Sequence, residues 1–283
     1  MGNIKIIADS TCDLSQNLIK QYDITIIPLC IVLDMESYYD LEEIVPEKIY
    51  EWSENCHKTP KTSAPSIQKV EDILLPFIKE GKDIIFIGIS EEMSTTCNVV
   101  HLIKNEYLYE RIFVINSMNL STGIGLQVLR AANMAGEGYR AEEIVAVIEG
   151  ARSDVRASFV VDTLEYLAMG GRCSSVTALL ASKLKLKPMI EVANGKMGVT
   201  KKYRGTLERS IMKYVEDMKE DLCKADKSYV FITHSGCTNE IIEEVKNYLA
   251  KLNYFENIEI TRAGGVVSSH CGPGTLGVLF YEK

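Results

Sequence analysis

Two short clusters of hydroxyl residues are the first places in this sequence where the residue types allow chemistry. They are Thr62-Ser63-Ala64-Pro65-Ser66 and Ser94-Thr95-Thr96. The first is expected in a loop that ends at a helix start, and the second between a strand and a helix. Each is compatible with simple helix capping. Together they also offer hydroxyls and free backbone N–H groups at two helix N-termini, a common way to bind an anion without a lysine.

Two of the four histidines stand where a ligand could reach them. His270 lies in a run of small and hydroxyl residues, Ser268 to Gly274, which is expected to be a loop. An imidazole there could sit beside an anion, where its positively charged form is favoured. His234 follows a strand end, and open α/β sheets bind ligands at such ends. A nucleophilic pair made of Cys271 and its neighbour His270 is disfavoured, because adjacent side chains rarely face each other and catalytic partners usually come from distant segments.

Two glycine motifs remain open to a structural and a functional interpretation. Gly170-Gly171-Arg172 follows a helical run, so it is either a glycine stop with a surface arginine or a segment that places Arg172 beside a ligand. Residues 272–277 match G-x-G-x-x-G, but only six residues follow them. A dinucleotide site needs this motif to open a helix. We therefore predict a glycine-rich turn into the last strand.

The elements that must position these residues alternate between strand and helix in the first half of the chain. Short apolar runs predict strands over 3–8, 24–27, 83–89 and 111–115. Pro46 suits a first helical turn, Ser66 can cap a helix that ends at Gly81 with a kink at Pro76, and 121–136 has a helical pattern. This alternation predicts a mainly parallel sheet with helices on both faces.

The second half has a different rhythm and predicts a smaller α+β domain. Strands are expected over 155–161, 186–192, 196–200, 228–233, 258–262 and 275–281, with a hairpin at Asn194-Gly195. Two short helices are expected between 163 and about Ser182, and longer ones over 207–223 and 240–252. We therefore predict two domains, 1–152 and 153–283.

Composition narrows the classes of function. The net charge of −8 disfavours nucleic acid as a partner. None of the eight cysteines forms a C-x-x-C pair and no histidine pair has zinc-ligand spacing, so no metal site is predicted. No secretory signal is visible, which predicts reduced thiols and a cytoplasmic location. No apolar run approaches the ~18 residues of a membrane span.

Taken in order, the motifs resemble those of the DegV family of bacterial fatty-acid-binding proteins over essentially the whole length. The matching segments are Asp9-Ser10-Thr11, Ile27-Pro28-Leu29, 62–66, Ile89-Ser90, 94–96, Leu164 to Leu167, 170–172, Leu186-Lys187-Pro188 and 269–274. A glycine is common in the family where this chain has Thr95. A β-branched residue would be an outlier there if the position required positive φ.

The resemblance implies a lipid-binding protein without a cofactor or catalytic residues of its own. Such proteins have an apolar tunnel between two α/β domains. The resemblance places a fatty acid carboxylate at Thr62 and Ser94, with Ser63 and Thr95 beside them and His270 near the head group. Gly171, Arg172 and Ser269 would lie close by. In related systems a separate kinase subunit phosphorylates the bound carboxylate, and Lys201, Lys202 and Arg204 are the expected docking patch.

Two other functions remain as alternatives. One is an autonomous acyl hydrolase or transferase that uses Ser94 with His270 or His234, which would need an acidic residue to orient the histidine. The other is a related phosphotransfer fold that binds a small polyol covalently through a histidine, which predicts a small polar pocket.

Overall fold

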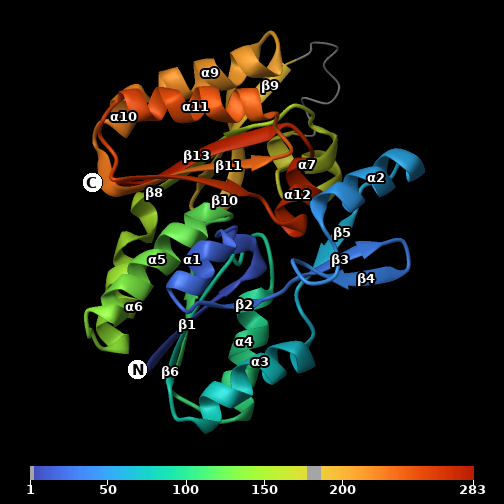
Figure 1. Cartoon of the computed structure of the whole chain (residues 1–283). Coiled ribbons are helices and arrows are strands. Elements are labelled where there is room, and N and C mark those ends of the chain that lie inside the picture. The colour runs from blue at the N-terminus through green and yellow to red at the C-terminus, as the bar shows by residue number, and fades with distance from the viewer. Residues whose placement is uncertain (1–2, 177–185) are drawn as a thin grey trace.

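The structure is a computed structural model that describes residues 3–176 and 186–283 (Figure 1). Its first sheet has four parallel strands in the order β2-β1-β6-β7. Their bounds are β1 Ile4–Asp9, β2 Thr25–Ile27, β6 Asp83–Gly88 and β7 Ile112–Asn116. The predicted parallel sheet is therefore confirmed.

Side-chain alternation explains why this sheet is covered on both faces. Within β6, Ile84 and Phe86 pack with α3 (Ile67–Lys79) and α4 (Thr96–Glu106), whereas Ile85 and Ile87 belong to the apolar cluster that contains α5 (Thr122–Gly136) and α6 (Ala141–Ala151). Successive residues of a strand point to opposite faces, so a continuous apolar run needs helices on both. The short element η1 (Ser10–Cys12) follows β1, and α1 (Gln16–Gln21) precedes β2 and adds Leu18 to the apolar cluster of α5 and α6.

The second half of the chain forms a six-stranded, mostly antiparallel sheet in the order β10-β9-β8-β13-β11-β12, and only β11 and β12 pair in parallel. The strands are β8 Val155–Val160, β9 Leu186–Ala193, β10 Lys196–Arg204, β11 Ala225–Ser235, β12 Asn257–Arg262 and β13 Thr275–Glu282. Among the described residues, the helices of this half with defined bounds are α7 Glu165–Gly170, α9 Leu207–Asp217, α10 Lys219–Leu222, α11 Asn239–Lys251 and α12 Gly265–Cys271, and η2 spans Arg152–Asp154. The predicted α+β character is confirmed.

Local signals explain several of these elements. Asn194 and Gly195 both have positive φ, as the predicted tight hairpin requires. The helix predicted over 207–223 is divided into α9 and α10 at Met218. Residues 272–274 turn into β13 as expected, with positive φ at Gly272 and Gly274. The second short helix expected to end near Ser182 extends outside the described residues.

Helix α5 lies between the two sheets (Figure 1). It contacts β1 and β6 of the first sheet and β8, β11 and β13 of the second. The largest apolar cluster accordingly contains Ile6 and Ile87 from one sheet and Phe159 and Leu279 from the other. The division into domains at residues 152 and 153 stays a prediction.

A third sheet corrects the sequence interpretation of the first hydroxyl cluster. Strands β3 (Cys30–Leu33), β4 (Glu36–Tyr39) and β5 (Lys61–Ser63) form a small antiparallel sheet beside α2 (Pro46–Cys56). Thr62 and Ser63 therefore lie on a strand, where a loop was predicted. The pattern was missed because β5 has only three residues, and strand signals need a longer run.

The predicted loop over Ser268 to Gly274 is wrong in its first part, because Ser268 to Cys271 form the end of helix α12. Residues 263–272 are rich in glycine, serine and valine, which have modest or low helix propensity. Tertiary packing stabilises the helix instead. Its Val266 joins Ile31 of β3 and Ile49 of α2 in one apolar cluster. None of the described helices is long and apolar enough to cross a membrane.

Candidate functional site

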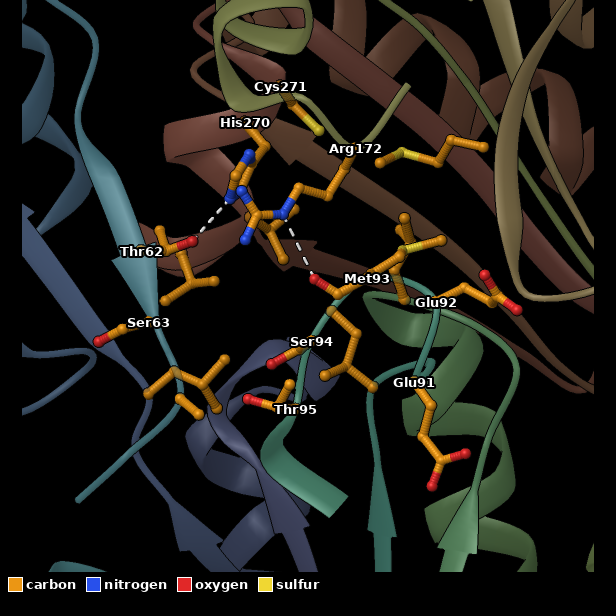
Figure 2. Close-up of a pocket in the computed structure, with 17 residues that line it drawn as sticks. Thr62, Ser63, Glu91, Glu92, Met93, Ser94, Thr95, Arg172, His270 and Cys271 are labelled. Atoms are coloured by element: carbon orange, nitrogen blue, oxygen red, sulfur yellow. Dashed lines mark hydrogen bonds between the residues drawn. The ribbon is translucent and has the colours of Figure 1, made fainter. Parts of the chain in front are cut away.

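A cavity of about 460 Å³ opens where the three sheets meet, within the usual range for small-molecule sites. Its lining is mostly apolar: Leu29, Ala64, Ile89, Met93, Leu120, Met197, Val266, Val267 and Cys271. The polar residues of the lining are Thr62, Ser63, Glu91, Glu92, Ser94, Thr95, Arg172 and His270 (Figure 2). The cavity therefore combines apolar surface with a small group of polar side chains, as a site for an amphiphilic molecule requires.

Thr62 and His270 form the polar centre of this cavity. Thr62 Oγ1 lies 2.8 Å from His270 Nε2, and Figure 2 shows the two side chains pointing toward each other. His270 Nδ1 is buried without a hydrogen-bond partner in the described part of the chain. A buried N–H without a partner is rarer than an unpaired acceptor. We therefore place the proton on Nε2, which leaves the Thr62 hydroxyl free to donate to a ligand.

Gly170 sets the position of the His270 ring. A Cβ atom on Gly170 would lie 2.3 Å from His270 Nδ1, much closer than any van der Waals contact. The imidazole therefore packs directly on the backbone of α7. The motif includes Gly170, but only Gly171 and Arg172 were expected beside the ligand, because only the fold shows what packs on each glycine.

In the ligand-free protein the His270 imidazole is neutral near pH 7, whereas the positively charged ring is expected only beside a bound anion. Burial lowers its pKa to about 4, and the positive charge of Arg172 acts in the same direction. A bound anion would oppose both effects. The neutral ring and the Thr62 hydroxyl thus offer hydrogen bonds rather than a fixed charge.

The second hydroxyl cluster follows β6 and leads into α4. Ser94 N donates to Ser90 O at 3.0 Å, and Ser94 Oγ lies 2.9 Å from Thr96 Oγ1. Thr95 is the N-cap of α4 with φ of −95°, so the position does not need the left-handed conformation that favours glycine. The threonine therefore introduces no backbone strain. Both Ser94 and Thr95 line the cavity, as the resemblance implies.

Arg172 reaches the same cavity from the segment that follows α7. Its Nε donates to Met93 O at 3.3 Å and its guanidinium also donates to Gly170 O at 2.7 Å. Within the described residues no carboxylate lies within 4 Å of it. Figure 2 shows its guanidinium beside His270. Arg172 therefore connects the loop before Ser94 with the histidine side of the cavity.

Two other residues expected near the ligand are not among those that line the cavity. Gly171 ends α7 with φ of +70°, and no atom of the described residues lies within 4 Å of a Cβ built on it. Ser269 is buried, and its hydroxyl donates to Gly265 O within α12 at 2.7 Å. Both have structural roles that explain their residue types.

A second, much smaller cavity of about 20 Å³ adjoins the first. The two share Leu120, Val267 and Cys271 in their linings. His234 lines only the smaller one. Burial lowers the pKa of His234 to about 4, with Arg262 acting in the same direction. His234 and Ser94 therefore line separate cavities.

The expected docking residues lie on β10, which is an edge strand of the six-stranded sheet. Lys202 and Arg204 are exposed and, two positions apart on a strand, share a face. Lys201 instead forms an ion pair with Asp217 at 2.5 Å and lies over the Tyr203 ring. Met197 of the same strand lines the cavity, so Lys202 stands about 17 Å farther along it.

The residues that the structure describes contain no group of three or more His, Cys, Asp or Glu side chains that could hold a metal ion.

The whole chain is similar to several known proteins. A DegV domain-containing protein of Clostridium perfringens is 32% identical over the full length of both chains. The solved structure of a DegV family protein from Thermus thermophilus, described by its fatty acid binding, has a TM-score of 0.91 at 28% identity and covers all of both chains.

Two further structures are described in similar terms. DegV of Bacillus subtilis, described as a fatty acid binding protein, has a TM-score of 0.86 at 28% identity over both full chains. A stearic acid-binding protein of Eubacterium ventriosum has a TM-score of 0.86 at 26% identity, covering 99% of this chain and 98% of that one. The family model described as "uncharacterised protein, DegV family" matches residues 3–283. The chain therefore belongs to the DegV family.

Proposed function

We propose that this protein binds one long-chain fatty acid, with the carboxylate at Thr62, Ser94 and His270, and presents it to a separate kinase for acyl-phosphate formation. The main support is the Thr62–His270 pair in the wall of a mostly apolar cavity. Neutral hydroxyls and an imidazole can hold one carboxylate oxygen and leave the other accessible. A bidentate arginine would engage both.

The apolar lining supplies most of the expected affinity. Each buried methylene contributes about 0.8 kcal/mol, so fourteen give roughly 11 kcal/mol before the cost of association is subtracted. A small polyol would gain none of this, and a mostly apolar lining does not suit it. The cavity therefore favours an acyl chain over the polyol alternative.

The autonomous hydrolase has less support from the site. Ser94 Oγ shares a hydrogen bond with Thr96 Oγ1, and His270 Nε2 shares one with Thr62 Oγ1. His270 Nδ1 faces Gly170, where a catalytic triad would need a carboxylate to orient the ring. We therefore propose that the protein has no acyl-transfer chemistry of its own. We also propose a cytoplasmic location, in keeping with eight cysteines that are all free thiols.

Native mass spectrometry of the purified protein, followed by denaturing lipid extraction, tests the proposal. We expect one fatty acid per chain, and the extract identifies its length and saturation. A ligand-free mass with no uptake of added palmitate or oleate would overturn the binding proposal. Turnover of a chromogenic ester that is lost in Ser94→Ala would instead support the hydrolase.

A further inference from the structure

Three aspartates lie buried behind the cavity, and none of them lines it. Asp9, Asp13 and Asp40 are at most 4% exposed. Within residues 3–176 and 186–283, no Lys, Arg or His nitrogen forms an ion pair with any of them. Buried carboxylates are costly unless hydrogen bonds satisfy them. Their hydrogen-bond partners therefore indicate why the fold keeps them.

Asp13 and Asp40 together bind the first turn of α12, the helix that carries His270. Gly264 N donates to Asp13 Oδ1 at 2.8 Å, and Gly265 N donates to Asp40 Oδ1 at 2.7 Å. Val266 N completes the set, donating to Asp40 Oδ2 at 3.3 Å. These N–H groups have no partner within a helix, and α12 has no N-cap side chain of its own.

The glycines at this helix start permit the close approach. A Cβ on Gly265 would lie 2.9 Å from Asp40 Oδ1, and one on Gly264 would lie 3.2 Å from Asp40 Oδ2. The carboxyl oxygens accept hydrogen bonds from N–H groups that have no partner within the helix, and α12 has only seven residues. The two carboxylates thus fix the start of a helix whose sixth residue is His270.

Asp9 acts on the opposite wall of the cavity. Its Oδ2 accepts a hydrogen bond from Ile89 N at 2.7 Å, at the end of β6. Ser90 follows, and its carbonyl accepts hydrogen bonds from Met93 N and Ser94 N. The carboxylate therefore holds the start of the turn that carries the Ser94 hydroxyl.

We propose that Asp9, Asp13 and Asp40, here called the aspartate cluster, are positioning residues that set the Ser94 turn and the His270 helix relative to each other. The role at the carboxylate site rests on the proposed function, whereas the placement of His270 can be measured without any lipid. Because β1, the turn after it and β4 lead to these residues, the N-terminal segment orients both walls of the cavity.

The test compares Asp13→Ala with Asp13→Asn. An asparagine keeps an acceptor for Gly264 N and can donate to Ser121 Oγ, which now donates to Asp13 Oδ2. Alanine removes both contacts. The readout is the Hε1–Cε1 NMR signal of His270 in lipid-free protein, assigned among the four histidines with His270→Asn. We expect a shifted or broadened signal and at least a tenfold loss of palmitate affinity in Asp13→Ala, with both restored in Asp13→Asn.

Two further variants separate positioning from simple loss of stability. Ile211→Ala removes a buried side chain from the core between α9 and the second sheet, away from the cavity. It should lower stability and leave the His270 signal unchanged. Asp40→Asn is a milder change than a substitution by alanine. Whichever way the amide is turned, its NH2 group faces one backbone N–H of α12. The His270 signal should therefore shift even if Asp13→Ala does not fold.

Unchanged His270 signals in Asp13→Ala and Asp40→Asn would overturn the proposal, as would an equal shift in Ile211→Ala. If the wild-type protein takes up no fatty acid while Asp13→Ala still shifts the His270 signal, the proposed function fails and the positioning role stands.

Discussion

Thr62 and His270 are 208 positions apart in the sequence, yet Thr62 Oγ1 and His270 Nε2 are joined by a 2.8 Å hydrogen bond. Their elements are held together by packing. Ile31, which pairs with Thr62 in the small sheet, shares an apolar cluster with Val266 of α12. The hydrogen bond therefore depends on the packing of the small sheet against α12.

Removing the Thr62 hydroxyl is the most direct test of this pair. Thr62→Val keeps the shape of the side chain and should lower fatty acid affinity, because a hydrogen bond to a charged group is worth about 1.5–3 kcal/mol, roughly a 10- to 150-fold change. Titration of lipid-free protein with palmitate measures it. Thr62→Ser keeps the hydroxyl and should stay within a few-fold of wild type; equal affinities in all three proteins would remove Thr62 from the site.

The adjacent glycines of α7 offer a matched pair of variants. In Gly170→Ala the new methyl would lie 2.3 Å from His270 Nδ1, so the ring must move and fatty acid binding should fall at least tenfold. In Gly171→Ala the new methyl meets no atom within 4 Å in the part of the chain that the structure describes, but alanine stands at φ of +70°. It should cost about 1 kcal/mol of stability and spare binding.

Thermal unfolding and palmitate titration of both glycine variants separate the two effects. The two substitutions add the same methyl group at neighbouring positions. A loss of binding in Gly171→Ala equal to that in Gly170→Ala would mean that the turn itself, rather than the contact with the imidazole, supports the site.

The first sheet and the hairpin of the second could be predicted from the sequence because their signals are local. Apolar runs bounded by turn residues revealed β1, β6 and β7, and Asn194-Gly195 revealed the turn between β9 and β10. Strand β5 has three residues and helix α12 seven, so neither carries a periodic pattern long enough to recognise.

The site could be predicted only as a set of residue types. Thr62, Ser94, Arg172 and His270 line one cavity as expected, but Ser269 and Gly171 do not. The Ser269 hydroxyl turns back to Gly265 O within α12, and in a short helix the direction of a side chain depends on tertiary contacts. Gly171 has no side chain and ends α7 in the left-handed conformation. The same limit hid the role of Gly170, which is to leave room for the imidazole of His270, 100 positions later in the chain.

Asp13 gives the stability of the protein a distinctive pH dependence. Burial raises the pKa of Asp13 to about 8, and the nearby carboxylates of Asp40 and Asp9 act in the same direction. The folded chain thus keeps a proton that the unfolded chain releases near pH 4. This contribution to stability is fully present below about pH 4 and is lost progressively as pH rises to about 8. The part lost between pH 7 and 9 is about 1.4 kcal/mol.

Urea unfolding of wild type and Asp13→Asn at pH 7, 8 and 9 isolates this effect. Burial also raises the pKa values of the buried thiols of Cys12 and Cys271, so stability falls with pH for a second reason. These thiols are present in both proteins and cancel in the difference. The free energy of unfolding of wild type should fall by about 1.4 kcal/mol more than that of Asp13→Asn. Parallel profiles would show that Asp13 is ionised throughout.

The edge strand β10 provides the test of the kinase partnership. Lys202 and Arg204 are exposed on one face, whereas Lys201 is held by Asp217. Exposed charges at an interface mainly set association rate and its dependence on salt. Lys202→Glu with Arg204→Glu should therefore leave fatty acid binding unchanged and slow phosphorylation by a fatty acid kinase of the same organism at least tenfold.

A matched control makes this result specific to β10. Lys246→Glu with Lys251→Glu changes net charge by the same amount on α11, which packs on β11 and β12 at the opposite edge of the sheet. Phosphorylation should then stay near the wild-type rate. Raising the salt concentration should reduce the difference in phosphorylation rate between the β10 variant and the wild type, because salt also slows the wild-type encounter. Equal slowing by both double variants would point to net charge alone, and normal phosphorylation of the β10 variant would remove Lys202 and Arg204 from the docking surface.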